Sequence, residues 1–147
     1  MPIRVQWDSN FSVGNDLLDQ QHRRLLGLCN DMAECLKAGE GEWQFRFHDI
    51  LHQLNQYARD HFKAEESLLQ KCQFAGMDAQ VAEHHTYVEK MTDWAFAASM
   101  DSIDMLEVQH YLAVWWRDHI LLSDMQYKGL VSSRDRLQGP SRFGPLT

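Results

Sequence analysis

Proline is scarce in this 147-residue chain and lies only near its two ends, at Pro2, Pro140 and Pro145. No proline therefore interrupts a helix between residues 3 and 139. The chain also lacks a run of 18 apolar residues and an apolar signal-peptide core, so neither a transmembrane helix nor a secretory leader is expected. Basic residues are too few for a nucleic-acid partner, because the net charge is −7.

Cysteine is also scarce, and its three positions form no C-x-x-C pair. The number and spacing of Cys29, Cys35 and Cys72 therefore argue against a disulfide framework and against a thiolate zinc site. We expect all three to be small buried side chains in a reducing environment, which predicts a cytoplasmic protein.

The chain does contain long segments with helical spacing of apolar residues, separated by glycines, while strand-like alternation and internal repeats are missing. The predicted helices span residues 16–37, 42–71, 78–99 and 103–130. They predict an all-α fold, an up-down-up-down antiparallel four-helix bundle with an N-terminal arm at residues 1–15. The domain would cover residues 1–131, and the polar segment 132–147 is interpreted as a linker or tail.

Eight histidines are an unusually high number for this length. His22, His61, His84 and His119 each lie in the apolar stripe of a different predicted helix. The third stripe, for example, also takes in Val81, Val88 and Met91, and the fourth takes in Trp115 and Leu122. One such histidine is more often an ordinary core residue than a ligand. Four in one core need partners, however, and a shared metal supplies them.

Two carboxylates extend this histidine set. Glu65 follows His61 by four residues and lies on the same helix face. Asp124 follows His119 by five residues, about 140° around an α-helix, and could still lean toward the same centre. Each alone would be a solvated charge, but beside buried histidines it could bridge two cations. Imidazole with carboxylate suits iron, manganese or zinc. The candidate metal ligands are His22, His61, Glu65, His84, His119 and Asp124.

The remaining histidines carry less information. His48, His52 and His110 fall beside the apolar stripes and are expected to face solvent. His85 follows His84 directly and points about 100° away from it. We expect it at the surface or as an outer partner of a ligand.

At these positions the sequence resembles the hemerythrin family, in particular bacterial hemerythrin-like domains, over about residues 5 to 130. Four motifs carry the resemblance. They are W-D-x-x-F-S-V-G-N (7–15), L-D-Q-Q-H (18–22), Y-x-x-x-H-F-x-x-E-E (57–66) and W-W-x-x-H-I-x-x-x-D-x-x-Y (115–127).

The resemblance implies a four-helix bundle holding two iron ions, with a bridging oxo or hydroxo group and dioxygen as the bound ligand. It also implies that His22 and His61 bind one iron, while His84 and His119 bind the other. Glu65 and Asp124 would then bridge the two ions.

The chain departs from the family on its third helix, where the resemblance implies two histidines spaced H-x-x-x-H. Gln80 stands four residues before His84. An alternative register pairs Val81 with His85, but it moves His84 out of the core. An amide is a much weaker ligand for iron than imidazole. Gln80 could bind weakly, hold a water molecule, or be a polar residue on the rim. Our hypothesis is an additional exchangeable position on the His84–His119 iron.

Trp115, Trp116 and Ile120 flank His119 and are candidate cofactor-binding residues together with Gln80. The family commonly has leucine at the position of Trp116. The larger side chain could narrow a dioxygen pocket and exclude water, or it could simply fill the core.

Three functions compete. The first is an oxygen or redox sensor that binds dioxygen or small anions and regulates an attached output domain. Residues 144–147 (G-P-L-T) resemble the D-x-L-T that opens diguanylate cyclase domains, which would suit a sensor. The second is a stand-alone dioxygen carrier, store or scavenger. A di-iron enzyme ranks last, because ferritin-like enzymes use carboxylate-rich ligand sets and this set is rich in histidine.

Overall fold

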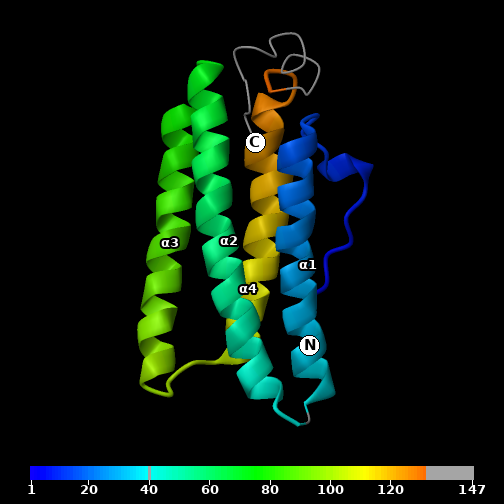
Figure 1. The fold of residues 1–147 in the computed structure, drawn as a ribbon, viewed down its shortest axis with the longest axis vertical. Coiled ribbons are helices and arrows are strands. Elements are labelled where there is room, and N and C mark those ends of the chain that lie inside the picture. Colours follow the sequence, from blue (N-terminus) through cyan, green and yellow to red (C-terminus); the bar gives the residue numbers. More distant parts are fainter. Residues whose placement is uncertain (40, 132–147) are drawn as a thin grey trace.

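The computed structural model describes residues 1–39 and 41–131. Its main elements are α1 (Asp16–Ala38), α2 (Trp43–Lys71), α3 (Met77–Ser99) and α4 (Met105–Asp118). They form the predicted antiparallel bundle, in which α1 lies beside α2 and α4 while α3 lies beside α2 (Figure 1). The described residues contain no strand, so the predicted all-α class is confirmed. The predicted linker at 132–147 lies outside the described residues.

Side-chain caps and one left-handed residue set the helix ends. The Asn15 side chain accepts a hydrogen bond from the Leu18 amide and donates one of 2.6 Å to the Val131 carbonyl. It therefore caps α1 and ties the start of α1 to residue 131. Gly39 ends α1 at φ 60°, a left-handed conformation that glycine adopts without strain. Asp104 caps α4 by accepting from the amides of Leu106 and Glu107.

The N-terminal arm is ordered along the outer side of α1, as expected (Figure 1). The Asn30 side chain exchanges two 2.9 Å hydrogen bonds with the backbone of Val5. The Gln109 side chain on α4 likewise pairs with both backbone groups of Ile3. These bonds hold the arm against α1 and α4 without adding it to the bundle as a fifth helix.

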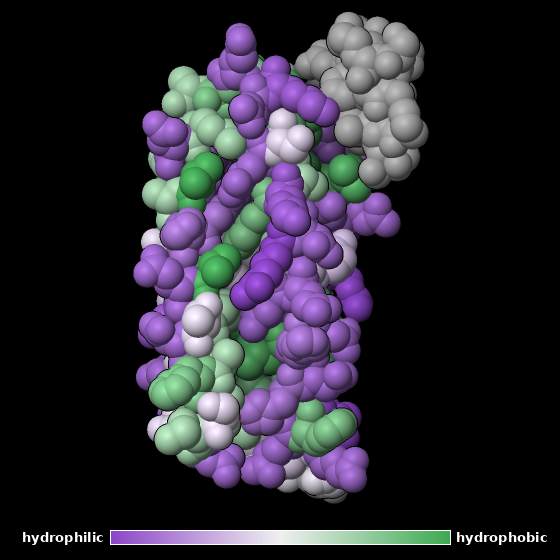
Figure 2. Space-filling model, turned by 60° about the vertical axis from the view of Figure 1, so that its left-hand side comes forward, coloured by the Kyte–Doolittle hydropathy of each residue, from purple (hydrophilic) through white to green (hydrophobic). Residues whose placement is uncertain are grey.

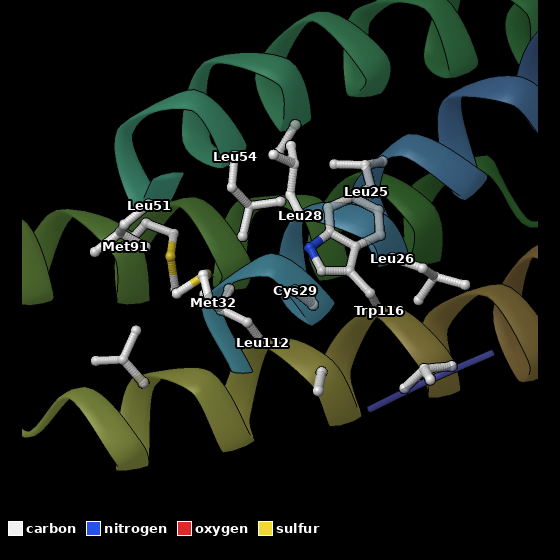
Figure 3. Packing of buried hydrophobic residues seen from close by; sticks show 14 of the residues in the cluster. Leu25, Leu26, Leu28, Cys29, Met32, Leu51, Leu54, Met91, Leu112 and Trp116 are labelled. Atoms are coloured by element: carbon white, nitrogen blue, oxygen red, sulfur yellow. The ribbon is translucent and has the colours of Figure 1, made fainter. Parts of the chain in front are cut away.

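Apolar side chains from all four helices fill the core in the half of the bundle that contains the start of α4 (Figure 3). Leu25, Cys29 and Met32 of α1 face Leu112 and Trp116 of α4, and all five are fully buried. The face drawn in Figure 2 is mostly hydrophilic, with hydrophobic side chains interspersed among the hydrophilic ones. No helix in the described part of the chain is both long and apolar enough to cross a membrane.

The fourth helix differs from the prediction of one α-helix over 103–130. α4 ends at Asp118, His119–Ser123 form a π-helical turn, and Asp124–Tyr127 form a 3-10 turn. The Asp124 amide bonds to the His119 carbonyl, five residues back. The wider turn changes the direction of the side chains within it, and Leu122, which was predicted to lie in the apolar stripe, is 68% exposed.

The predicted core face of α3 is partly wrong. Tyr87 and Trp94 are buried, whereas Val81 and Val88 are only half-buried. Aromatic side chains with a polar atom can fill a core if that atom finds a partner, and the Tyr87 hydroxyl accepts from the Trp116 indole at 3.2 Å. The buried positions of α3 still keep helical spacing, and they are Gln80, His84, Tyr87, Met91 and Trp94.

The cysteine prediction holds for two of the three residues. Cys29 and Cys35 are buried in α1. Cys72 is half-buried just beyond the end of α2, where its sulfur donates to the Leu130 carbonyl at 3.3 Å. The expectation that it is buried was wrong, because this end of α2 lies at the surface of the bundle.

Candidate metal centre

All six predicted ligands come together inside the bundle, and none is more than 3% exposed. α1 provides one histidine, α2 a histidine and a glutamate, α3 one histidine, and the π-helical turn with the next residue a histidine and an aspartate. Their donor atoms fall into two overlapping groups, each within 4.8 Å. The first group is His22, His61, Glu65 and Asp124, and the second is Glu65, His84 and His119.

Short distances join the donor atoms within and between these groups. The Nε2 atoms of His22 and His61 are 3.1 Å apart. Glu65 Oε1 lies 2.9 Å from His84 Nε2, and its Oε2 lies 3.7 Å from His61 Nε2. Each oxygen of Glu65 therefore faces a different histidine pair, which is the arrangement a bridging carboxylate needs.

The π-helical turn corrects the sequence estimate for Asp124. An α-helix would put Asp124 about 140° from His119, whereas the wider turn brings residues five apart close to one face. Asp124 Oδ1 lies 3.2 Å from His119 Nε2, and its Oδ2 lies 3.1 Å from His22 Nε2. Asp124 thus spans the two histidine pairs as Glu65 does.

Although these donor atoms lie close together, several of them are buried without forming a hydrogen bond among the described residues. They include His84 Nε2, His119 Nε2, Glu65 Oε1 and Asp124 Oδ2. Burying so many unsatisfied polar atoms in one place is costly. A cation at the point where they converge would satisfy them together. The donor set therefore fits a metal ion, and imidazole with carboxylate suits iron, manganese or zinc.

Charge within the metal-free cluster supports the same reading. Burial disfavours protonation of His22, but the neighbouring carboxylates of Asp124 and Glu65 raise its pKa to about 9. Burial lowers the pKa of His61 to about 3, so that imidazole is neutral. Burial and the charge of Glu65 raise the pKa of Asp124. The cluster therefore attracts positive charge, which a metal ion would supply in place of a proton.

Three further side chains orient the histidines from outside the donor set. His61 Nδ1 lies 2.6 Å from Gln21 Oε1, His84 Nδ1 lies 2.6 Å from Glu66 Oε2, and His119 Nδ1 lies 2.7 Å from Glu83 Oε1. None of these roles was predicted from the sequence. The available signal was adjacency in sequence, since each partner directly precedes or follows a candidate ligand.

A buried tyrosine also contacts the cluster. The Tyr127 hydroxyl donates a 2.5 Å hydrogen bond to Glu65 Oε2. Burial and the charges of Glu65 and Asp124 hold its pKa well above the usual range, so the phenol keeps its proton. Tyr127 therefore fixes the rotamer of Glu65 as a hydrogen-bond donor.

Gln80 is 2% exposed, so the rim alternative for this residue is wrong. Its Nε2 donates a 3.0 Å hydrogen bond to Asp124 Oδ1, while its Oε1 has no partner among the described residues. The register with Gln80 and His84 facing inward agrees with the structure, because the His85 side chain is 80% exposed. His52 is also exposed, but His48 and His110 are half-buried rather than solvent-facing.

Aromatic rings pack directly on the histidines. Trp115 stacks on His119 with ring centroids 4.4 Å apart, and Phe62 stacks on His84 at 3.9 Å. Trp116 is fully buried, and its ring centroid lies 5.8 Å from that of His61. Ile120 is fully buried in the same core. Trp115, Trp116 and Ile120 were predicted from the sequence to lie beside the candidate ligands. Phe62, which directly follows His61, was not.

The chain is similar to known proteins over most of its length. Residues 13–131 match the family described as Hemerythrin HHE cation binding domain. The chain belongs to the hemerythrin family. Hemerythrin-like protein from Naegleria gruberi is 30% identical over 131 residues, which cover 89% of this chain and 97% of that protein. Bacteriohemerythrin from Clostridium acetobutylicum is 27% identical over 128 residues, covering 82% and 96% of the two chains.

Solved hemerythrin structures share the bundle. The wild-type hemerythrin crystal structure superposes with a TM-score of 0.79 at 24% identity, covering 87% of this chain and 98% of that one. That likeness shows the fold. Membership of the hemerythrin family together with the His, Glu and Asp cluster supports a metal-binding and oxygen-binding domain.

Proposed function

We propose that this hemerythrin domain holds two iron ions, binds dioxygen and acts as an oxygen or redox sensor. The observation that carries the proposal is the division of the cluster into two histidine pairs that share Glu65 and Asp124. His22 and His61 would hold one ion, and His84 and His119 the other. When bound, a pair of ferrous ions supplies electrons for reversible dioxygen binding.

The chain's own residues prepare the site for that ligand. Trp116, Ile120 and Phe62 exclude water from the buried face of the cluster, since each is 5% exposed or less. Tyr127 keeps Glu65 oriented through the hydroxyl hydrogen bond. Gln80 contributes no imidazole and directs its amide nitrogen to Asp124. We propose that the His84–His119 ion therefore keeps an additional position open to solvent or small anions.

A sensor reading is supported by where the ligands lie on the last helix. His119 begins the π-helical turn, and Asp124 directly follows it. π-helical turns occur often at functional sites. A change of ligands at the metal would act directly on this turn and on the segment after it. We propose an attached output domain as the recipient, with a diguanylate cyclase as one candidate.

The alternative is a stand-alone dioxygen carrier, store or scavenger. The two histidine pairs alone would serve it equally well, and the open position is the feature that favours a sensor. Catalysis is not part of the proposal, because the ligand set is histidine-rich. Reduced Cys29 and Cys35 inside α1 suit a cytoplasmic location.

Replacing Gln80 with histidine tests the open position. We expect Gln80→His to slow air oxidation of the reduced, iron-loaded protein and to weaken azide binding, because a fifth imidazole would occupy the exchangeable position. Stopped-flow absorption and azide titration measure the two effects. The oxidation rate and the azide affinity should each fall by about tenfold or more if imidazole replaces an exchangeable ligand.

Gln80→Leu is the matched control, since it removes the amide without adding a ligand. It should leave azide binding at least as strong as in the parent protein. Equal oxidation rates and azide affinities in the parent and Gln80→His would rule out the open position, and with it the argument for a sensor over a carrier.

A further inference from the structure

We propose that Glu66 and Glu83 make the two metal positions unequal, so that the His84–His119 position binds a divalent cation first and more tightly. This inference rests on the proposed two-metal function. Glu66 and Glu83 lie outside the donor set, and they determine which of the two metal positions fills first.

The inner ligands do not favour the His84–His119 position. The His22–His61 group holds both Glu65 and Asp124, whereas the His84–His119 group holds Glu65, with Asp124 Oδ1 3.2 Å from His119 alone. Gln80 adds no imidazole, and its amide nitrogen is already directed to Asp124. Tighter binding at the His84–His119 position must therefore come from the groups around its ligands.

The outer partners are not matched. Both imidazoles of the His84–His119 position pair through Nδ1 with a carboxylate, Glu66 at 2.6 Å and Glu83 at 2.7 Å. At the other position, His61 Nδ1 pairs with the neutral amide of Gln21. His22 Nδ1 has no hydrogen-bond partner among the described residues. Two negative charges thus support one position and none supports the other in this way.

An imidazole that donates its Nδ1 hydrogen to a carboxylate becomes a stronger donor at Nε2, and such partners change metal affinity by about 10- to 100-fold. Glu83 is itself held by Ser123, whose hydroxyl donates to Glu83 Oε1 at 2.7 Å. The Glu66 and Glu83 side chains are 32% and 44% exposed. Solvent screens them partly, so we expect the lower end of that range, about tenfold for each.

Both carboxylates also line surface cavities that reach the same position. Glu83 and His119 line a cavity of about 300 Å³ between α3 and α4. Glu66 and His84 line one of about 190 Å³ between α2 and α3. His22 and His61 line neither cavity. A cation arriving from solvent therefore meets the carboxylates and the His84–His119 pair before the deeper pair.

Co²⁺ titration of the metal-free protein, followed by visible absorption, tests the inference. His61→Ala leaves the His84–His119 position, and His84→Ala leaves the other. The His61→Ala variant should bind Co²⁺ at least about tenfold more tightly than the His84→Ala variant does. Adding Glu83→Gln should weaken binding about tenfold in the His61→Ala background and leave it unchanged in the His84→Ala background.

Asp118→Asn is the control, because Asp118 lines the same cavity but pairs with Arg117. It should not alter Co²⁺ affinity. Gln21→Glu should tighten binding in the His84→Ala background, since it adds a carboxylate to His61. Urea unfolding of each metal-free variant checks that the fold is kept.

The inference is overturned if His84→Ala binds Co²⁺ as tightly as His61→Ala, or if Asp118→Asn weakens binding as much as Glu83→Gln. The parent protein, titrated separately, must take up two Co²⁺ ions. Failure of that uptake would overturn the proposed function itself, whereas normal uptake with unaffected variants would overturn only the inequality.

Discussion

Replacing Glu65 with glutamine should strip the protein of both metal ions. Glu65 is the one residue whose oxygens belong to both donor groups. An amide removes the negative charge at the centre of four imidazoles and leaves a single weak oxygen donor. The affinity for Fe²⁺ should fall by about 100-fold or more, beyond the effect of losing an outer partner. Iron per chain, measured after anaerobic loading and desalting, reports the loss.

Glu89→Gln is the matched control for that experiment, because Glu89 is exposed on α3 and its loss makes the same change in charge. It should retain the iron content of the parent. Circular dichroism should show the same helix content in both variants, since glutamine still offers the Tyr127 hydroxyl an acceptor. Full iron retention by Glu65→Gln would mean that Glu65 does not bridge the two positions.

Truncating Trp116 should cause the largest loss of stability from a single change. Its side chain is fully buried, stacks on Phe62 at 5.5 Å and donates to the Tyr87 hydroxyl. Trp116→Ala leaves a large cavity and an unpaired phenol, and it should lower the free energy of unfolding by about 3–5 kcal/mol. Urea unfolding of the metal-free protein measures this without the stabilisation that bound metal would add.

Phe45→Ala provides the comparison, because Phe45 is 73% exposed and its truncation should change stability by about 0.5 kcal/mol or less. A loss below about 1 kcal/mol for Trp116→Ala would show that the core around the histidines is not packed on this ring. Trp116 would then lose its structural role beside the cluster.

The fold and the gathering of the four histidines in one core could be predicted from the sequence because both follow helical periodicity. His22, His61, His84 and His119 interrupt apolar stripes, and a polar residue in a stripe signals a buried partner. The position of Asp124 could not be predicted in the same way. It depends on the π-helical turn at His119–Ser123, which an α-helical count of 100° per residue cannot represent.

The outer partners were missed for a different reason. Glu66 and Glu83 are partly exposed carboxylates on α2 and α3, so in the sequence they look like ordinary surface charges. Only the packing of neighbouring helices places them against the Nδ1 atoms of His84 and His119. The burial of Tyr87 and Trp94 was not predicted either, because the apolar stripe expected on α3 contained Val81 and Val88, whereas aromatic rings fill its core face.

Iron analysis of the parent protein tests the central claim most directly. The protein would be loaded with Fe²⁺ without oxygen, desalted, and assayed for iron, with absorption spectra recorded before and after air. Two histidine pairs sharing two carboxylates inside a helix bundle predict about two iron ions per chain and new near-ultraviolet absorption after air. One iron ion or none per chain, or a spectrum unchanged by air, would contradict the proposed dioxygen-binding centre.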